Sequence, residues 1–268
     1  MEAEKPETPR KSETPLTVEQ QARRRTIKAF AWFGAASLLP FGVWKLIKSQ
    51  PRAGGVPQSL RNVLDRNGQL ANAYFSQARL APTFPKSMAA KRVRVNGRDG
   101  LKTPLDREAW RLEINQPGVS PLALTLDDIR ALPKHEIVFE FKCIEGWSQI
   151  QHWGGTRFSD FVRRYNLGTR NGKDAQQDAD WFDYVGMQTP DRQYYVGIDM
   201  GSALHPQTLL CYEMNGKPLD DAHGAPLRLI IPVKYGVKNL KRIGTISFSD
   251  QRPRDFWAER GYDYHIGL

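Results

Sequence analysis

The chain has 268 residues, 40% of them hydrophobic and 25% charged, which is enough for a buried core and excludes wholesale disorder. Its two cysteines exclude a disulfide framework and a four-cysteine zinc or iron–sulfur site. The formal charge of +10 is evenly divided, because residues 1–52 carry ten Lys/Arg against five Asp/Glu and the remainder carries 29 against 24. The larger part is therefore only mildly basic, and nucleic acid is not expected as a partner.

The N-terminal region is polar and lacks apolar periodicity, so a disordered cytoplasmic tail is expected over residues 1–28. Its last six residues, Arg-Arg-Arg-Thr-Ile-Lys over 23–28, resemble a twin-arginine export signal. The route that reads such a signal carries proteins that are already folded and that often hold a cofactor. The domain that follows is therefore expected outside the cytoplasm.

An apolar run of 19 residues follows over 29–47, close to the ~20 residues that cross a bilayer as a helix. Trp32 and Trp44 lie toward its two ends, where aromatic side chains often mark a membrane interface. Because no small-x-small cleavage site follows, we expect a transmembrane or signal-anchor helix, a bacterial inner-membrane location and a periplasmic domain. The alternative interpretation of this run is a buried helix of a soluble protein.

Proline and glycine predict a linker over 48–59, and a single domain is expected over 60–268. Thr125 or Asp127 is the expected N-cap of a short helix, and a second short helix is expected from Ser159. Irregularly spaced strands with short helices between them indicate an α+β domain with mixed sheets rather than a doubly wound parallel sheet. The predicted strands are 91–95, which leads into a turn at Asn96-Gly97, then 137–142 and 227–232.

Several common active-site signatures are missing from the sequence. It contains no Gly-x-Gly-x-x-Gly, P-loop, His-Glu-x-x-His or Gly-x-Ser-x-Gly, and its five histidines lack metal-ligand spacing. Spacing alone leaves open a nucleophilic Cys143 paired with His152 or His223. Without context, a lone cysteine after a strand is more often a small buried hydrophobe.

Two groups of residues stand out when they are considered together. The first is Phe-Lys-Cys-Ile-Glu-Gly-Trp-Ser over 141–148 with Trp-Gly-Gly over 153–155. The second comprises 209–219 (Leu-Leu-Cys-Tyr-Glu-Met-Asn-Gly-Lys-Pro-Leu), 223–229 (His-Gly-Ala-Pro-Leu-Arg-Leu) and 232–238 (Pro-Val-Lys-Tyr-Gly-Val-Lys). Together they resemble the sulfite-oxidase superfamily of molybdopterin enzymes. They are most similar to the bacterial periplasmic branch that includes the protein-methionine-sulfoxide reductase catalytic subunit.

The resemblance covers about residues 70–262 and implies a sulfite-oxidase-type fold that binds Mo-molybdopterin. In the family, the cysteine of the Cys-x-Glu-x-Trp-Ser block is the thiolate ligand of molybdenum, so Cys143 is the implied metal ligand and catalytic residue. His223 departs from the reductase branch, which commonly has asparagine there. The residues implied to bind the cofactor are Asn72, Phe75, Ser76, Cys143, Thr189, His223, Arg228, Gly236, Val237 and Lys238.

The chemistry of the residues agrees with this resemblance. Molybdenum held by sulfur favours a soft thiolate ligand, and a pyranopterin phosphate needs a basic pocket rich in donors. Residues 228–254 carry seven Lys/Arg against the single acid Asp250. A solvated basic face is the alternative interpretation of this cluster.

The implied activity is oxygen-atom transfer between the metal and a small-molecule or protein-bound substrate. Sulfite oxidases have arginines directly after the ligand cysteine, whereas this chain has Ile144-Glu145-Gly146, which favours reduction of a neutral S-oxide or N-oxide. No Cys-x-x-Cys-His haem motif occurs, so a separate haem-containing membrane subunit or cytochrome is the implied electron partner. The alternatives are a sulfite dehydrogenase of the same superfamily and a metal-free, membrane-tethered binding module.

The resemblance also bears on His152 and Cys211. His152 either faces the cofactor cavity or is structural. Cys211 is expected in the core, because a Cys143–Cys211 disulfide would consume the metal ligand.

Overall fold

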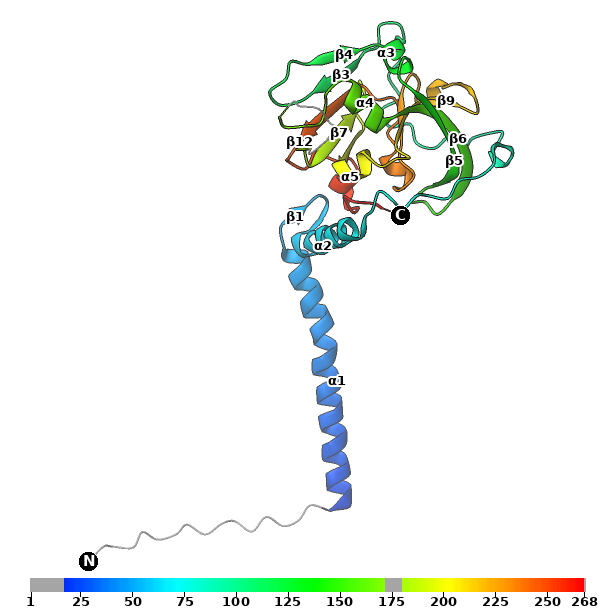
Figure 1. Ribbon diagram of the computed structural model, residues 1–268. Coiled ribbons are helices and arrows are strands. Elements are labelled where there is room, and N and C mark those ends of the chain that lie inside the picture. Colours follow the sequence, from blue (N-terminus) through cyan, green and yellow to red (C-terminus); the bar gives the residue numbers. More distant parts are fainter. Residues whose placement is uncertain (1–16, 172–179, 268) are drawn as a thin grey trace, which may run out of the picture. The chain divides into compact units, whose positions relative to one another are not determined.

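The computed structural model describes residues 17–171 and 180–267, and the chain divides into two compact units, Met1–Pro51 and Arg52–Leu268 (Figure 1). Residues 1–16 of the expected tail lie outside the described residues. The first unit contains the helix α1 (Val18–Ser49), which includes the twin-arginine-like residues. The second unit contains all the sheets.

Helix α1 begins at a complete capping box. The Thr17 hydroxyl accepts the N–H of Gln20, and the Gln20 side chain accepts the N–H of Thr17. The helix contains the whole of the expected run 29–47, with Pro40 inside it. By length and composition it is apolar enough to cross a membrane.

The second unit is a mixed α+β body, which confirms the fold class expected from the sequence. Its helices are α2 (Gln58–Tyr74), α3 (Leu126–Arg130), α4 (Phe158–Arg164) and α5 (Met200–Ala203), with 3₁₀ turns η1 (Lys86–Met88), η2 (Asp221–His223), η3 (Gly236–Lys238) and η4 (Ala258–Arg260). Its strands are β1 (Arg52–Ala53), β2 (Val56–Pro57), β3 (Leu112–Asn115), β4 (Leu122–Leu124), β5 (Lys134–Lys142), β6 (Ser148–Arg157), β7 (Tyr184–Gln188), β8 (Tyr195–Asp199), β9 (Leu209–Met214), β10 (Lys217–Pro218), β11 (Arg228–Ile230) and β12 (Thr245–Ser249).

Two five-stranded sheets organise this body. One has the order β10-β9-β6-β5, with β11 beside β9, and its long pair β5–β6 curves along one side of the unit in Figure 1. The other has the order β4-β3-β12-β7-β8. Since β12 runs parallel to β3 and antiparallel to β7, this second sheet is mixed.

The body has two apolar clusters, the larger of which also includes Leu210 and Tyr212 of β9 and Leu229 of β11 from the first sheet. The larger cluster packs β3, β7 and β12 against α3 and α4, and includes Leu112, Ile114, Ile129, Phe158, Phe161, Val185 and Ile246. The smaller cluster is built on β5, β6 and β9, and includes Val93, Phe139, Phe141, Trp153 and Cys211. Cys211 is fully buried and both cysteines are free, as expected.

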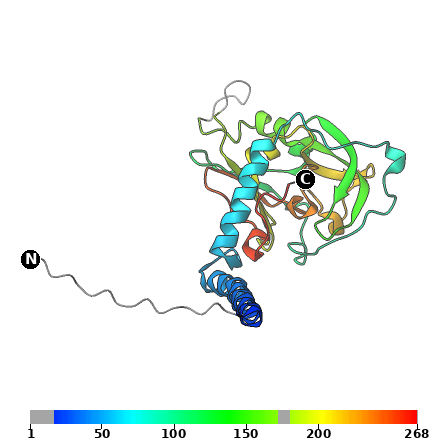
Figure 2. The same cartoon turned by 90° about the horizontal axis from the view of Figure 1, so that it is seen from below.

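Residues 48–59, for which a linker is expected, contain the end of α1, the β1–β2 hairpin and the start of α2. Helix α2 belongs to the second unit and lies along it (Figure 2). The buried Arg61 guanidinium donates to the backbone oxygens of Ala258 and Tyr262, at 2.6 and 3.0 Å. These bonds attach α2 to the C-terminal segment.

Within residues 60–268, the predicted strands and short helices are confirmed except at one segment. Before this range, residues 18–28 of the expected disordered tail are helical, because the capping box at Thr17 begins α1 ahead of the apolar run. Strand β5 contains 137–142, β11 lies within 227–232, and Thr125 caps α3 in a capping box with Asp128. The strand predicted over 91–95 is wrong. Its backbone bonds a side chain instead of a neighbouring strand, because Arg94 N donates to Gln149 Oε1 at 3.0 Å and Gln149 Nε2 donates to Arg92 O at 3.2 Å.

Candidate functional site

Cys143 lies in the tight turn that joins β5 to β6. Its N–H donates to the oxygen of Trp147 at 2.9 Å, and its oxygen accepts the N–H of Gly146 at 3.0 Å. Gly146 has a φ of +88°, a conformation that side chains with a Cβ rarely adopt. The β5–β6 pairing therefore fixes the cysteine at the end of a rigid hairpin.

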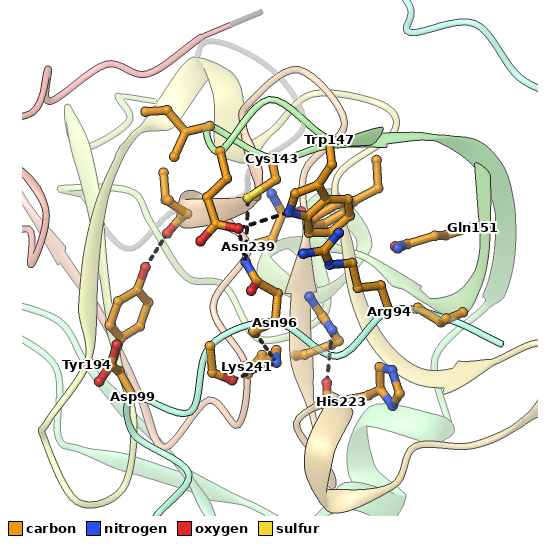
Figure 3. A pocket seen from close by; sticks show the side chains of 18 of the residues that line it. Arg94, Asn96, Asp99, Cys143, Trp147, Gln151, Tyr194, His223, Asn239 and Lys241 are labelled. Atoms are coloured by element: carbon orange, nitrogen blue, oxygen red, sulfur yellow. Dashed lines mark hydrogen bonds between the residues drawn. The ribbon is translucent and has the colours of Figure 1, made fainter. Parts of the chain in front are cut away.

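A cavity of about 370 Å³ opens beside this turn (Figure 3). Five residues implied by the resemblance line it together, which are Cys143, His223, Arg228, Gly236 and Val237. It is also lined by Trp147 of the cysteine block, by Lys241 of the basic cluster 228–254, and by residues that no sequence pattern identified, among them Arg94, Asn96, Asp99, Gln151, Tyr194, Asn239, Trp257 and Tyr262. The three-dimensional fold thus brings the separated sequence blocks to one site.

Arg228 is a buried cation in the wall of this cavity. Its Nη1 donates to the oxygen of His223 at 2.9 Å, and its guanidinium lies 4.4 Å from the centre of the Trp153 ring. Burial lowers its pKa to about 10. It forms no ion pair with a carboxylate in the described part of the chain, and its Nε is buried without a hydrogen-bond partner.

Lys241 is a second cation on the cavity wall. Its ammonium donates to three backbone oxygens, those of Asn96, Gly97 and Ala222, at 2.5, 3.2 and 3.0 Å. Burial, and then the charge of Arg228, lowers its pKa to about 8. Neither cation forms an ion pair with an acid of the described residues, so the part of the wall that holds Arg228 and Lys241 suits an anion.

His223 presents one unsatisfied nitrogen in the same wall. Its Nδ1 lies 2.7 Å from Asp220 Oδ1, which assigns the Nδ1 proton to that hydrogen bond. Its Nε2 is buried and has no partner among the described residues. A buried polar atom without a partner at a cavity wall is available to a bound group.

Asn96 links the sulfur of Cys143 to the carboxylate of Glu145. Asn96 Nδ2 lies 3.6 Å from Cys143 Sγ and 3.3 Å from Glu145 Oε2. The indole N–H of Trp147 donates to the same carboxylate oxygen at 3.0 Å, and the Arg94 guanidinium lies 4.7 Å from the Trp147 ring centre. Figure 3 shows Asn96, Trp147 and Arg94 on the side of the cavity that holds the cysteine.

Other implied residues lie at two further cavities. Phe75 and Ser76 line a cavity of about 560 Å³, which Ile144 of the cysteine turn also lines. Asn72 and Lys238 line a cavity of about 120 Å³. The implied site residues are therefore divided among three cavities. Ile144 lines both the cavity of Cys143 and the cavity of Phe75 and Ser76.

Lys238 and Thr189 have internal partners. The buried Lys238 ammonium donates to the oxygen of Gly197 at 2.9 Å and to Asp255 Oδ2 at 2.5 Å. The buried Thr189 hydroxyl donates to Asp191 Oδ1 at 2.6 Å. Neither side chain lines the cavity of Cys143.

The basic cluster 228–254 is mostly neutralised by acids from other segments. Its cations Lys234, Lys238, Arg252 and Arg254 pair with Asp199, Asp255, Asp65 and Glu259, respectively. Arg228 and Lys241 remain as its cations at the cavity of Cys143. His152 is buried on β6 with its Nε2 3.4 Å from Glu136 Oε1, and it does not line that cavity.

Residues 100–257 match the model of a protein family described as oxidoreductase molybdopterin binding domain. The chain belongs to this family. The match confirms the predicted enzyme class and the sulfite-oxidase-type molybdopterin-binding fold.

Curated relatives resemble the chain over much of its length. It is 35% identical over 196 residues to the putative protein-methionine-sulfoxide reductase subunit YedZ1 of Azospira oryzae, which covers 72% of this chain and 70% of that protein. It is 33% identical over 169 residues to the protein-methionine-sulfoxide reductase catalytic subunit MsrP of Campylobacter jejuni, covering 59% and 54%. The MsrP of Xanthomonas campestris is 31% identical over 154 residues, covering 56% and 48%. The chain thus spans about half the length of these catalytic subunits.

The fold can also be compared with a solved structure. The sulfane dehydrogenase SoxCD from Paracoccus pantotrophus aligns with a TM-score of 0.47 and 17% sequence identity, over 66% of this chain and 46% of that one.

The residues around Cys143 fit an anionic pterin that carries a soft metal. Cys143 offers a sulfur ligand at the cavity, Arg228 and Lys241 offer positive charge that no acid of the described residues neutralises, and His223 offers a free nitrogen. No group of three or more His, Cys, Asp or Glu in the described ranges could hold a metal ion alone. A metal at Cys143 would therefore need ligands that a cofactor brings.

Proposed function

We propose that the chain is a molybdenum-cofactor-dependent oxidoreductase that transfers an oxygen atom, and that it reduces an S-oxide or N-oxide. The observation that carries the proposal is the convergence of Cys143 with the two unneutralised cations Arg228 and Lys241 at one cavity. The family match and the reductase relatives support the oxidoreductase class and the sulfoxide substrate.

The chain's own residues hold the cofactor in this proposal. The Cys143 thiolate would ligate the metal, Arg228 would donate N–H groups to the anionic pterin, and His223 Nε2 would bond a polar atom of it. Lys241, whose three N–H groups bond backbone oxygens, would contribute its positive charge. Thr189, Lys238, Asn72, Phe75 and Ser76, the other implied residues, lie outside this cavity. Asn72, Phe75, Ser76 and Lys238 contribute in this proposal by shaping the adjoining cavities and the η3 turn that carries Gly236 and Val237. Thr189 contributes by bonding the backbone of Tyr194, which lines the cavity of Cys143.

When bound, the cofactor supplies two-electron oxygen-atom chemistry. The overall reaction consumes a sulfoxide, two electrons and two protons, and it releases a thioether and water. The aromatic side chains of Trp147, Trp257 and Tyr262 line the cavity and limit the access of water to it. Glu145 accepts hydrogen bonds from Asn96 and Trp147, which hold its negative charge beside the sulfur.

Electrons must come from a partner, because the chain has no haem motif of its own. We propose a haem-containing membrane subunit or cytochrome as this partner. Helix α1 would keep the oxidoreductase domain in the membrane's neighbourhood, with that domain in the periplasm and the twin-arginine-like residues serving export.

A sulfite dehydrogenase is the second candidate, and one feature of the cavity favours it. The turn after Cys143 has Glu145 where sulfite oxidases have arginine, but Arg94 brings a guanidinium to the same cavity from another segment. A cation at this place is suited to a sulfite dianion.

Steady-state assays of the holoprotein separate the two candidates. We expect methionine sulfoxide to be reduced with reduced methyl viologen, and sulfite to give little reduction of ferricyanide. Cys143→Ala should abolish turnover, whereas Cys211→Ala, which removes the other cysteine, should keep it because Cys211 lies in the core. Faster turnover of sulfite than of any S-oxide or N-oxide would reject the reductase proposal.

A further inference from the structure

We propose that Asn96 is a positioning residue that donates a hydrogen bond to the Cys143 sulfur and thereby raises the reduction potential of the metal site. The inference rests on the proposed function, since it requires Cys143 to be a thiolate ligand. It concerns a residue outside every sequence block that resembles the family. Asn96 directly follows segment 91–95, for which the predicted strand is wrong.

The geometry identifies the amide nitrogen as the atom that faces the sulfur. Asn96 Nδ2 is 3.6 Å from Cys143 Sγ, within the range of a hydrogen bond to sulfur, and 3.3 Å from Glu145 Oε2. Both neighbours are acceptors when ionised, so an N–H group rather than the amide oxygen must point at them. In the described residues, no other side chain donates to this sulfur.

The backbone of Asn96 is held in place independently of its side chain. The Lys241 ammonium donates to the oxygens of Asn96 and Gly97, at 2.5 and 3.2 Å, and the same ammonium bonds Ala222 O. The chain just before Asn96 is also held, because the Gln149 side chain bonds the backbone of Arg92 and of Arg94. The donor is therefore preorganised, and its position does not depend on a bound cofactor.

A second contact joins the same segment to the cysteine turn. The Arg94 guanidinium lies over the Trp147 ring, and the Trp147 indole donates to Glu145, the carboxylate that Asn96 also contacts. The segment 94–96 thus contacts the first, third and fifth residues of the turn 143–147. Such support from outside the ligand is what fixes the orientation of metal ligands in proteins.

The effect on the potential follows from the direction of the hydrogen bond. A donor withdraws electron density from the sulfur and so stabilises the more electron-rich, reduced form of the site. Reduction adds electrons to the site and strengthens this hydrogen bond. Removing the donor should therefore lower the midpoint potential and make the site harder to reduce.

The test is a redox titration of the holoprotein in which the Mo(V) signal is followed by electron paramagnetic resonance. Asn96→Leu removes the donor and keeps a side chain of similar size, and we expect its midpoint potentials to fall below those of the wild type. Asn96→Gln keeps an amide N–H, and its midpoint potentials should lie between those of the wild type and those of Asn96→Leu. Val95→Ala is the matched control, because Val95 is the exposed neighbour of Asn96 and does not line the cavity, and its potentials should stay unchanged.

Molybdenum content per chain distinguishes the possible failures. No molybdenum in the folded wild type would refute the proposed function itself. Molybdenum-loaded Asn96→Leu with wild-type potentials would overturn only the role of Asn96. If Asn96→Leu and Asn96→Ala fold but contain no molybdenum, Asn96 is a cofactor-binding residue and its role in setting the potential is also rejected.

Discussion

Arg228 is a buried cation whose surroundings in the described residues lack a negatively charged partner. A buried guanidinium normally has a carboxylate partner, because an unpaired buried charge is costly. Arg228 has only the oxygen of His223 and the face of Trp153 in the described structure. An anionic cofactor would complete its surroundings.

Replacing this guanidinium should therefore weaken cofactor retention. We expect Arg228→Met, which keeps much of the apolar volume, to reduce the pterin bound per chain by at least about tenfold, since a charge-assisted hydrogen bond contributes roughly 1.5–3 kcal/mol. Pterin fluorescence after denaturation measures this content. The control is Arg130→Met, which removes an exposed cation over Tyr212 and should bind pterin as the wild type does. Equal pterin in Arg228→Met would contradict its proposed role.

Lys241 should make retention of the cofactor depend on pH. Its pKa of about 8 means that the ammonium is charged below that pH and neutral above it, so the affinity of the cavity for an anion falls as pH rises. We expect more pterin to dissociate from the wild type at pH 9 than at pH 7 during gel filtration. Lys241→Gln should lose pterin readily at both values.

Lys234 supplies a matched control for this pH effect. Burial also lowers its pKa to about 8, but it pairs with Asp199 and lines the neighbouring cavity. Lys234→Gln should therefore keep the pH dependence of the wild type. If the pH dependence of pterin retention disappeared in Lys234→Gln and persisted in Lys241→Gln, Lys234 and not Lys241 would be the titrating group.

Sequence patterns identified the residues that belong to recognisable blocks and missed those that do not. Cys143, His223 and Arg228 were expected because they belong to blocks that resemble the family, and they meet at one cavity. Asn96 belongs to no such block, and it meets Lys241 of the basic cluster, 145 positions further along the chain, only because the chain folds back on itself. No periodicity or spacing rule connects two such positions.

At the scale of elements, the hairpin β5–β6 and its neighbour β9 carry the cysteine. Gly154 and Gly155 lie where β6 crosses β9, and the register shifts between them. A Cβ on Gly155 would lie 2.1 Å from the oxygen of Leu210 and 2.6 Å from the Cα of Cys211. The two strands approach more closely here than a side chain allows.

Gly155→Ala should accordingly destabilise the body by about 3 kcal/mol or more, because the atoms that must move are backbone atoms. Gly154→Ala is the matched control, since its Cβ would meet mainly the flexible Glu213 side chain at 3.3 Å, and it should cost less than about 1 kcal/mol. Urea unfolding, followed by fluorescence, measures both. Equal urea midpoints for the two variants would contradict the claim that the close approach of β6 and β9 excludes a side chain at Gly155.

Local sequence signals predicted single elements but not their pairing. The β-branched and aromatic residues of 137–142 predicted a strand, and β5 confirms it. The alternation over 91–95 gave a wrong prediction because a single glutamine side chain, that of Gln149, satisfies its backbone. The mixed sheet, in which β12 lies parallel to β3, depends on contacts between residues more than a hundred positions apart.

At the scale of the whole molecule, the chain combines an apolar helix with a separate oxidoreductase unit. The expected helix 29–47 could be recognised because a run of 19 residues whose only charged member is Lys45 is unusual outside membranes. Helix α1 includes it completely. The sequence gives no comparable signal for the boundary at Pro51, where proline and glycine only indicate a break.

We expect this helix to anchor the chain. The full chain should remain in the membrane fraction after alkaline carbonate extraction, whereas a variant that starts at Arg52 should be found in the soluble fraction. Both should contain the same pterin per chain, because the cavity is formed by residues of the second unit. Recovery of the full chain in the carbonate supernatant would contradict the anchor.

X-ray absorption at the molybdenum K-edge tests the central claim most directly, because it reports the atoms bound to the metal. Holoprotein should show molybdenum with sulfur neighbours, and Cys143→Ser should show one sulfur neighbour fewer, replaced by a lighter atom. Cys211→Ala should give the wild-type spectrum, since that cysteine lies in the core. The same number of sulfur neighbours in Cys143→Ser as in the wild type would contradict the assignment of Cys143 as the metal ligand.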